Sequence, residues 1–112
     1  MGKMSREKGK AGEREAAGEW AKAFGGTARR GVQFQGSKDS PDIVTDHANI
    51  HIEVKRCESG SLYLWLAQAK FDCGGKIPVV LHRKNKKKWV VIMELDDAPA
   101  FVREISGDTE IL

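Results

Sequence analysis

Two acidic residues and a lysine stand out in residues 40–55, which read Ser-Pro-Asp-Ile-Val-Thr-Asp-His-Ala-Asn-Ile-His-Ile-Glu-Val-Lys. Asp42 follows a proline, and after a further ten residues Glu53 and Lys55 flank Val54. Two carboxylates on one patch suit a hard divalent cation such as Mg²⁺, with Mn²⁺ as a substitute. A lysine beside them can hold or deprotonate an attacking water. We therefore predict Asp42 and Glu53 as catalytic metal ligands, the Val54 carbonyl as a further ligand, and Lys55 as catalytic.

A β-hairpin must bring these residues together. Residues 43–45 are apolar, residues 46–49 have the composition of a turn, and residues 50–56 alternate apolar with polar side chains. The period of two puts Ile50, Ile52 and Val54 on one face. It puts His51, Glu53 and Lys55 on the other, with Glu53 and Lys55 about 7 Å apart. A solvated strand face with a surface ion pair would give the same pattern, so this alternative stays open.

A helix predicted over residues 5–24 adds a third acid. Its apolar stripe consists of Ala16, Ala17, Trp20 and Phe24, and two glycines follow it. Glu13 lies on this stripe, whereas Glu15 and Glu19 fall on the opposite, solvated face. An inward carboxylate needs a partner, and a metal shared with Asp42 and Glu53 would supply one. The alternative is that Glu13 reaches water at the frayed start of the stripe.

These motifs resemble a known nuclease family. Pro41-Asp42 followed by Glu53-Val54-Lys55 resembles the PD-(D/E)xK motif, and residues 8–14, Lys-Gly-Lys-Ala-Gly-Glu-Arg, resemble the first helix of archaeal Holliday-junction resolvases. The similarity covers residues 6–95, but specific motifs lie only within the first 55. It implies a restriction-endonuclease-like fold and Glu13 as a metal-site glutamate. It also implies cleavage that leaves a 5′ phosphate, a loop serine (Ser37, or else Ser40), and a supporting glutamine on the second helix, Gln68.

The rest of the chain predicts a mixed sheet flanked by helices. We expect a first strand within residues 25–35, with Val32 and Phe34 on one face and Arg29 and Arg30 just before it. A second helix follows from residue 62 or 65 to residue 73, and residues 77–83 and 89–95 form a hairpin. Asp96 is expected to cap a last helix whose Phe101, Val102 and Ile105 pack inward. The order is α-β-β-β-α-β-β-α, of α/β (α+β) class, in a single domain over residues 1–112.

Basic residues gather in two clusters, although the net charge is only +3. One cluster lies within residues 1–14 and the other within residues 83–88, whose segment 84–88 we term the lysine turn. Separated basic clusters predict a phosphate backbone as partner, although a lysine-rich turn could merely keep a hairpin soluble. The predicted DNA contacts are Lys8, Lys10, Arg14, Arg29, Arg30, Ser37, Lys38, Gln68, Lys84, Lys86 and Lys87.

Other classes of protein are disfavoured. No apolar run approaches the roughly 20 residues that span a bilayer, and the charged N-terminus lacks a signal-peptide core, so we expect a cytoplasmic protein with no membrane partner. Cys57 and Cys73 have no zinc-ligand spacing, and we expect them to be reduced. We expect no nucleotide cofactor.

The resulting prediction is a Mg²⁺-dependent, structure-selective DNA endonuclease that resolves four-way junctions, as a homodimer, in recombination or repair. Three alternatives remain. The first is a virus-type nuclease acting on flaps, nicks or duplex DNA. The second is a DNA-binding module without catalysis, and the third is a protein-interaction domain with a basic face.

Overall fold

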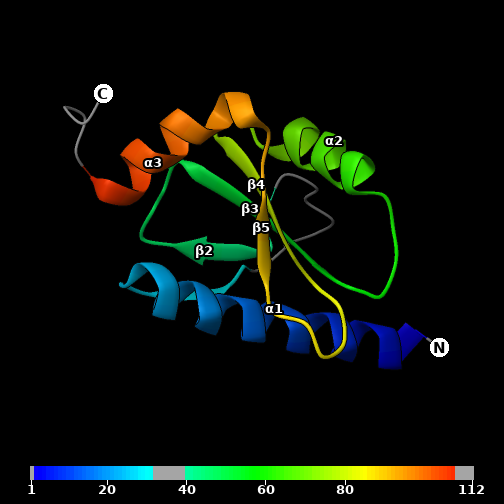
Figure 1. Cartoon of the computed structure of the whole chain (residues 1–112). Helices are drawn as coiled ribbons and strands as arrows, with labels where there is room; N and C mark the ends of the chain where they lie inside the picture. The colour runs from blue at the N-terminus through cyan, green and yellow to red at the C-terminus, as the bar shows by residue number, and fades with distance from the viewer. Residues whose placement is uncertain (1, 32–39, 108–112) are drawn as a thin grey trace.

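The computed structural model describes residues 2–31 and 40–107, with side chains from residue 9 onward. The elements are α1 (Gly2–Phe24), β1 (Ala28–Arg30), β2 (Ile43–Thr45), β3 (Ile50–Arg56), α2 (Leu62–Asp72), β4 (Ile77–Arg83), β5 (Val90–Ile92), the 3₁₀ turn η1 (Leu95–Asp97) and α3 (Ala98–Ser106) (Figure 1). This order confirms the predicted α-β-β-β-α-β-β-α arrangement. No helix in these two ranges is both long and apolar enough to cross a membrane.

The five strands form one mixed sheet in the order β1-β2-β3-β4-β5. β2 and β3 pair antiparallel, with Ile43 opposite Ile52, which confirms the predicted hairpin. β3 and β4 pair in parallel over seven residues each, and α2 makes the crossover that a parallel pair requires. The strand that carries Glu53 and Lys55 therefore lies at the centre of the sheet.

Helices cover both faces of this sheet (Figure 1). On one face, Ala16, Ala17 and Trp20 of α1 pack on Ile43, Ile50 and Ile52, as the two periodicities predicted. On the other face, Leu66 and Ala69 of α2 pack on Val80. Phe101 of α3 meets the rings of Trp20 and Phe24 edge-on, at centroid distances of 6.2 and 5.9 Å.

The first strand begins earlier than predicted. Arg29 and Arg30 lie inside β1, opposite Val44 and Ile43, so their expected position before the strand is wrong. Because β1 is an edge strand, charged side chains can reach solvent from it and discourage pairing with other chains. Val32 and Phe34 lie outside the described residues.

Two local predictions near the C-terminus are also wrong. Asp96 lies within η1, and Asp97 occupies the N-cap position of α3 without a side-chain capping bond. Val102 is 47% exposed, whereas Phe101 and Ile105 pack on the core. The second helix begins at Leu62, where the Ser61 side chain accepts a hydrogen bond from the Leu64 amide.

Candidate active site

Asp42 is held against β3 by two hydrogen bonds. Its amide donates to the Ile52 carbonyl, and its carboxylate Oδ2 accepts from the Val54 amide, each at 2.8 Å. Asp42 directly precedes β2, so the antiparallel pairing of β2 with β3 brings it to this part of the strand. The carboxylate is thereby fixed to the backbone amide between Glu53 and Lys55.

Gly31 fixes the same segment from the other side. Its amide donates to the Asp42 carbonyl at 2.8 Å. A Cβ atom at position 31 would lie 2.1 Å from the Pro41 carbonyl oxygen, closer than real Cβ contacts allow. The backbone can approach Pro41-Asp42 this closely because residue 31 has no side chain. Sequence reasoning missed Gly31, since nothing local marks its contact with residue 41.

The acidic residues interact electrostatically around Asp42. The pKa of Asp42 is raised to about 7, above all by burial. The neighbouring carboxylates of Glu53 and Glu13 contribute to this rise, whereas the hydrogen bond from the Val54 amide and the Lys55 ammonium oppose it. Glu13, Glu53 and Lys55, the other three residues predicted as catalytic, therefore each lie within electrostatic reach of Asp42.

Glu13 already has a protein partner. Its Oε1 accepts a hydrogen bond from Arg30 Nε at 2.8 Å, and the two side chains are 21% and 31% exposed. The inward glutamate on the α1 stripe is thus paired with an arginine from the edge strand. Arg30 was predicted to contact DNA, and without DNA it forms this ion pair.

The donor set fits a cation held by two carboxylates. Over the residues that the structure describes, no three histidine, cysteine, aspartate or glutamate side chains gather as a metal-binding group. Asp42 and Glu53, however, are neighbouring carboxylates with little solvent, the Glu53 side chain being 12% exposed. Mg²⁺ is commonly held by one or two carboxylates together with water and substrate phosphate. Asp42 and Glu53 therefore suit a cation that keeps water and phosphate ligands better than a cation enclosed entirely by protein ligands.

A family comparison adds an independent observation. The model of a family described as "Phage putative PDDEXK endonuclease" matches residues 4–111. The chain belongs to this family. The PD-(D/E)xK part of the sequence resemblance is therefore confirmed, while a specific similarity to archaeal resolvases is not shown. Searches of curated proteins and of solved structures gave no significant match.

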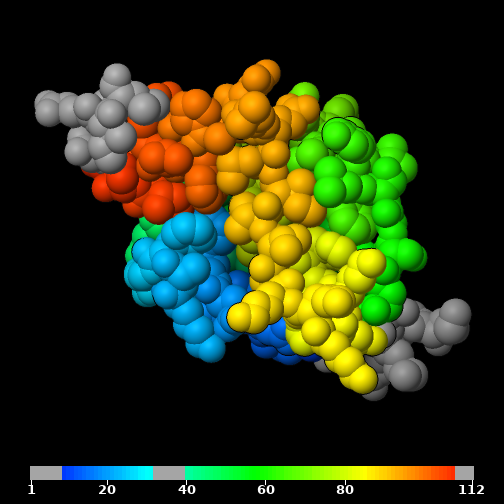
Figure 2. Space-filling model, viewed as in Figure 1, coloured from blue at the N-terminus to red at the C-terminus, as the bar shows by residue number. Residues whose placement is uncertain are grey.

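The lysine turn of this PDDEXK family member is anchored to the end of β3, just beyond Lys55. Arg56, which follows Lys55, donates through Nη2 to Asn85 Oδ1 at 2.7 Å, and the Asn85 amide donates to Glu58 Oε2 at 2.8 Å. Figure 2 shows the turn in yellow, standing out between α1 in blue and α2 in green. Three exposed cations on it were predicted to contact DNA: Lys84, Lys86 and Lys87.

The other predicted DNA contacts are more scattered. Arg14 and Arg29 are exposed, and Lys10 is half-buried on α1. Gln68 of α2 donates from Nε2 to Asp72 Oδ2 at 2.9 Å. Ser37 and Lys38, together with the side chain of Lys8, lie outside the described residues. Ser40 is half-buried.

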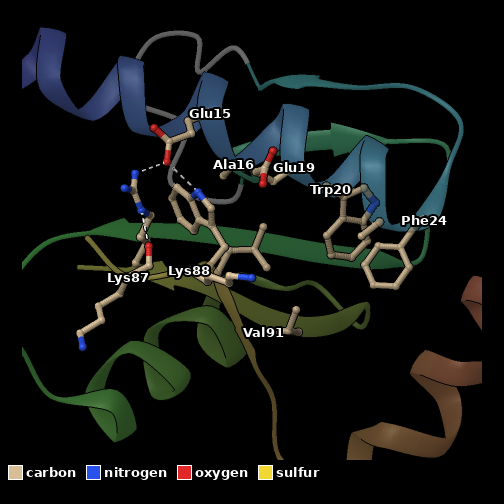
Figure 3. A pocket seen from close by; sticks show the side chains of 12 residues that line it. Glu15, Ala16, Glu19, Trp20, Phe24, Lys87, Lys88 and Val91 are labelled. Atoms are coloured by element: carbon tan, nitrogen blue, oxygen red, sulfur yellow. Dashed lines mark hydrogen bonds and ion pairs between the residues drawn. The ribbon is translucent and has the colours of Figure 1, made fainter. Parts of the chain in front are cut away.

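Glu15 lies on the exposed face of α1, as predicted, but its partners there were not predicted. Its carboxylate accepts hydrogen bonds from Trp89 Nε1, at 2.8 Å, and from Arg83. Glu15 lines a groove of about 600 Å³ between α1 and the β4–β5 hairpin. Figure 3 shows Trp20 and Phe24 on the α1 side of this groove. None of the four predicted catalytic residues lines this groove. The acidic cluster, made up of Glu13, Asp42 and Glu53, is therefore a separate site.

Proposed function

We propose that this chain is an endonuclease that cleaves DNA in a reaction dependent on Mg²⁺ or Mn²⁺. The observation that carries the proposal is the hydrogen bond from the Val54 amide to Asp42 Oδ2. It joins the Pro-Asp segment to the Glu-x-Lys strand, which are the two halves of the motif named in the family description. The buried, mutually repelling carboxylates support a cation as their missing partner.

In this proposal Asp42 and Glu53 hold the metal, with the Val54 carbonyl as a further oxygen. When bound, the cation polarises the scissile phosphate, stabilises the departing oxygen and lowers the pKa of a water. Lys55 projects from the same strand two residues beyond Glu53, so it orients the attacking water or stabilises developing charge. The water gives up a proton to solvent as its oxygen forms a bond to phosphorus and the bond to the 3′ oxygen breaks. The 3′ oxygen takes up a proton and leaves as a hydroxyl, and the phosphate stays on the 5′ end of the other product.

Glu13 contributes according to the state of its ion pair. While Arg30 Nε donates to Glu13 Oε1, the Glu13 carboxylate neutralises the arginine and does not bind a metal ion. A phosphate that attracts Arg30 would free Glu13 toward Asp42, which already feels its charge. We therefore assign Glu13 as the third catalytic acid and Arg30 as a phosphate contact in the DNA-bound enzyme.

We propose branched DNA, including four-way junctions, as the substrate. The lysine turn and the basic start of α1 offer cations to phosphates, and no element within the described ranges is built to read base edges in a major groove. Cutting two symmetric strands requires paired active sites, so we propose a two-fold homodimer. Several apolar side chains on and beside α2 are at least 70% exposed and are candidates for its interface: Tyr63, Leu64, Phe71 and Leu95.

A substrate panel tests this proposal. Labelled four-way junction, flap, nicked duplex and linear duplex would each be incubated with Mg²⁺, Mn²⁺ or EDTA. We expect metal-dependent cutting with a preference for the junction. Equal cutting of linear duplex would refute junction selectivity but leave the nuclease standing, and salt-sensitive binding without product would refute catalysis. Light scattering of the free protein and of the junction complex tests the dimer.

A further inference from the structure

A buried histidine lies beside the proposed metal site. His51 is on β3, two residues before Glu53, and is 1% exposed. Its Nε2 is buried and has no hydrogen-bond partner in the part of the chain that the structure describes. Sequence periodicity placed His51 on the same face as Glu53 and Lys55, but it did not predict that this end of the face would be covered.

Among the residues that the structure describes, Glu53 places an acidic atom close to this nitrogen. His51 Nε2 lies 3.7 Å from Glu53 Oε1, with side-chain exposures of 2% and 12%. This distance is too long for a hydrogen bond, but a movement of about 0.8 Å would make one. Both residues lie on the face of β3 that α2 covers, since Glu53 pairs with Val80 and Val80 packs on Leu66 and Ala69. Little water is therefore present to replace the missing bond.

We propose that His51 is a positioning residue for Glu53. When Glu53 takes up its metal-holding position, His51 Nε2–H donates to Oε1 and so turns Oε2 toward Asp42. The imidazole acts in this way whether neutral, as the Nε2–H tautomer, or charged, because it is a donor in either form. Outer hydrogen bonds of this kind orient ligating side chains, and in a dry site they are stronger than in water. The inference rests on the proposed function, because it needs Glu53 to be a metal ligand.

A purely structural role for His51 makes a different prediction. If the ring only fills space under α2, an apolar side chain of similar size would serve equally well. If Nε2–H orients Glu53, the N–H matters and the ring does not. Glutamine also offers an N–H at its Nε2 position, whereas phenylalanine keeps the ring and loses the donor.

Mn²⁺ binding to the DNA-free protein separates the two roles. We would titrate wild type, His51→Phe and His51→Gln with Mn²⁺, following free Mn²⁺ by electron paramagnetic resonance, and check folding by thermal melting. We expect Mn²⁺ affinity to fall about 10- to 100-fold in His51→Phe and to recover largely in His51→Gln. The Mn²⁺ concentration for half-maximal cleavage should rise by the same factor, with kcat at saturating metal nearly unchanged.

His47→Phe is the matched control. His47 also carries an unpartnered buried ring nitrogen within the described ranges, but it packs against Trp20 and Phe24. Its substitution should leave Mn²⁺ affinity unchanged. If His51→Phe does not fold, His51→Leu gives the same comparison.

Two outcomes would overturn the inference alone: wild-type Mn²⁺ affinity in His51→Phe, or equal loss in His51→Phe and His51→Gln. A wild-type protein that binds no Mn²⁺ and cuts no DNA would instead overturn the proposed function, and this inference with it.

Discussion

Replacing Gly31 with alanine should impair catalysis without touching any proposed catalytic side chain. The new Cβ would lie 2.1 Å from the Pro41 carbonyl oxygen and 3.3 Å from its carbonyl carbon. Both contacts are with backbone, so no flexible side chain can move aside. The Pro41-Asp42 segment or β1 must shift instead.

The size of the effect follows from this contact. Relieving it requires a displacement of about 1 Å, and a misplacement of this size at a catalytic group can cost on the order of 100-fold in rate. The overpacking should also lower the free energy of unfolding by about 1–3 kcal/mol. Because Gly31 donates to the Asp42 carbonyl, the strain acts directly on the residue whose carboxylate is bonded to Val54.

Single-turnover cleavage at saturating metal, with denaturant unfolding in parallel, measures both quantities. Gly18→Ala is the matched control, because a Cβ there meets nothing within 4 Å and the residue is exposed on α1. It should cleave at the wild-type rate and gain up to about 1 kcal/mol of stability. A folded Gly31→Ala protein that cuts as fast as wild type would refute the reasoning.

Three further predictions concern charge. Burial raises the pKa of Glu15, but hydrogen bonds from Trp89 and Arg83 outweigh it and lower the pKa below its usual 4.5. Glu15→Ala should therefore lower the free energy of unfolding by about 1 kcal/mol near neutral pH, and by less as pH falls through the lowered pKa. Glu19→Ala should change it little. Urea unfolding at several pH values measures both variants. Because the pKa of Asp42 is raised from 3.8 to about 7 by folding, the metal-free protein loses stability as pH rises through this range. In EDTA, Asp42→Asn should therefore raise Tm above pH 7 and leave it unchanged near pH 4. Calorimetry measures both shifts, and an equal shift at the two pH values would contradict this prediction. Changing the three predicted DNA contacts of the lysine turn to glutamine should make the slope of log K against log [salt] shallower, by about 0.9 for each phosphate that the turn no longer neutralises. Lys22→Gln should leave this slope unchanged. A slope unchanged by the triple substitution would exclude the turn as a DNA-binding element.

Local sequence patterns predicted the helices and strands, and they predicted that Asp42 and Glu53 lie close together. The alternation in residues 50–56 identified β3, and the turn at residues 46–49 placed β2 beside it, so the approach of Asp42 to Glu53 followed from hairpin geometry. The bounds of β4 were predicted for the same reason, since its apolar run ends where the charges begin. Both signals depend on residues close together in the chain.

Contacts between distant segments were not predictable in this way. Glu15 meets Arg83 and Trp89 across more than 60 residues, and periodicity could only place it opposite the apolar stripe. Likewise, the period of two assigned His51 to a face but could not tell that this end of the face would be buried. Periodicity identifies which side chains share a face, whereas the tertiary fold determines what covers it.

The most direct test compares wild type with Asp42→Asn and Lys55→Ala on labelled four-way junction and matched linear duplex, with Mg²⁺ and with EDTA. Asparagine at position 42 can still accept from the Val54 amide, so Asp42→Asn keeps the contact that holds this segment against β3. We predict Mg²⁺-dependent cutting by wild type, and a loss on the order of 100-fold or more in each variant. Cutting that survives both substitutions, or tight binding without any product under Mg²⁺ and Mn²⁺, would contradict the assignment of the active site to these residues.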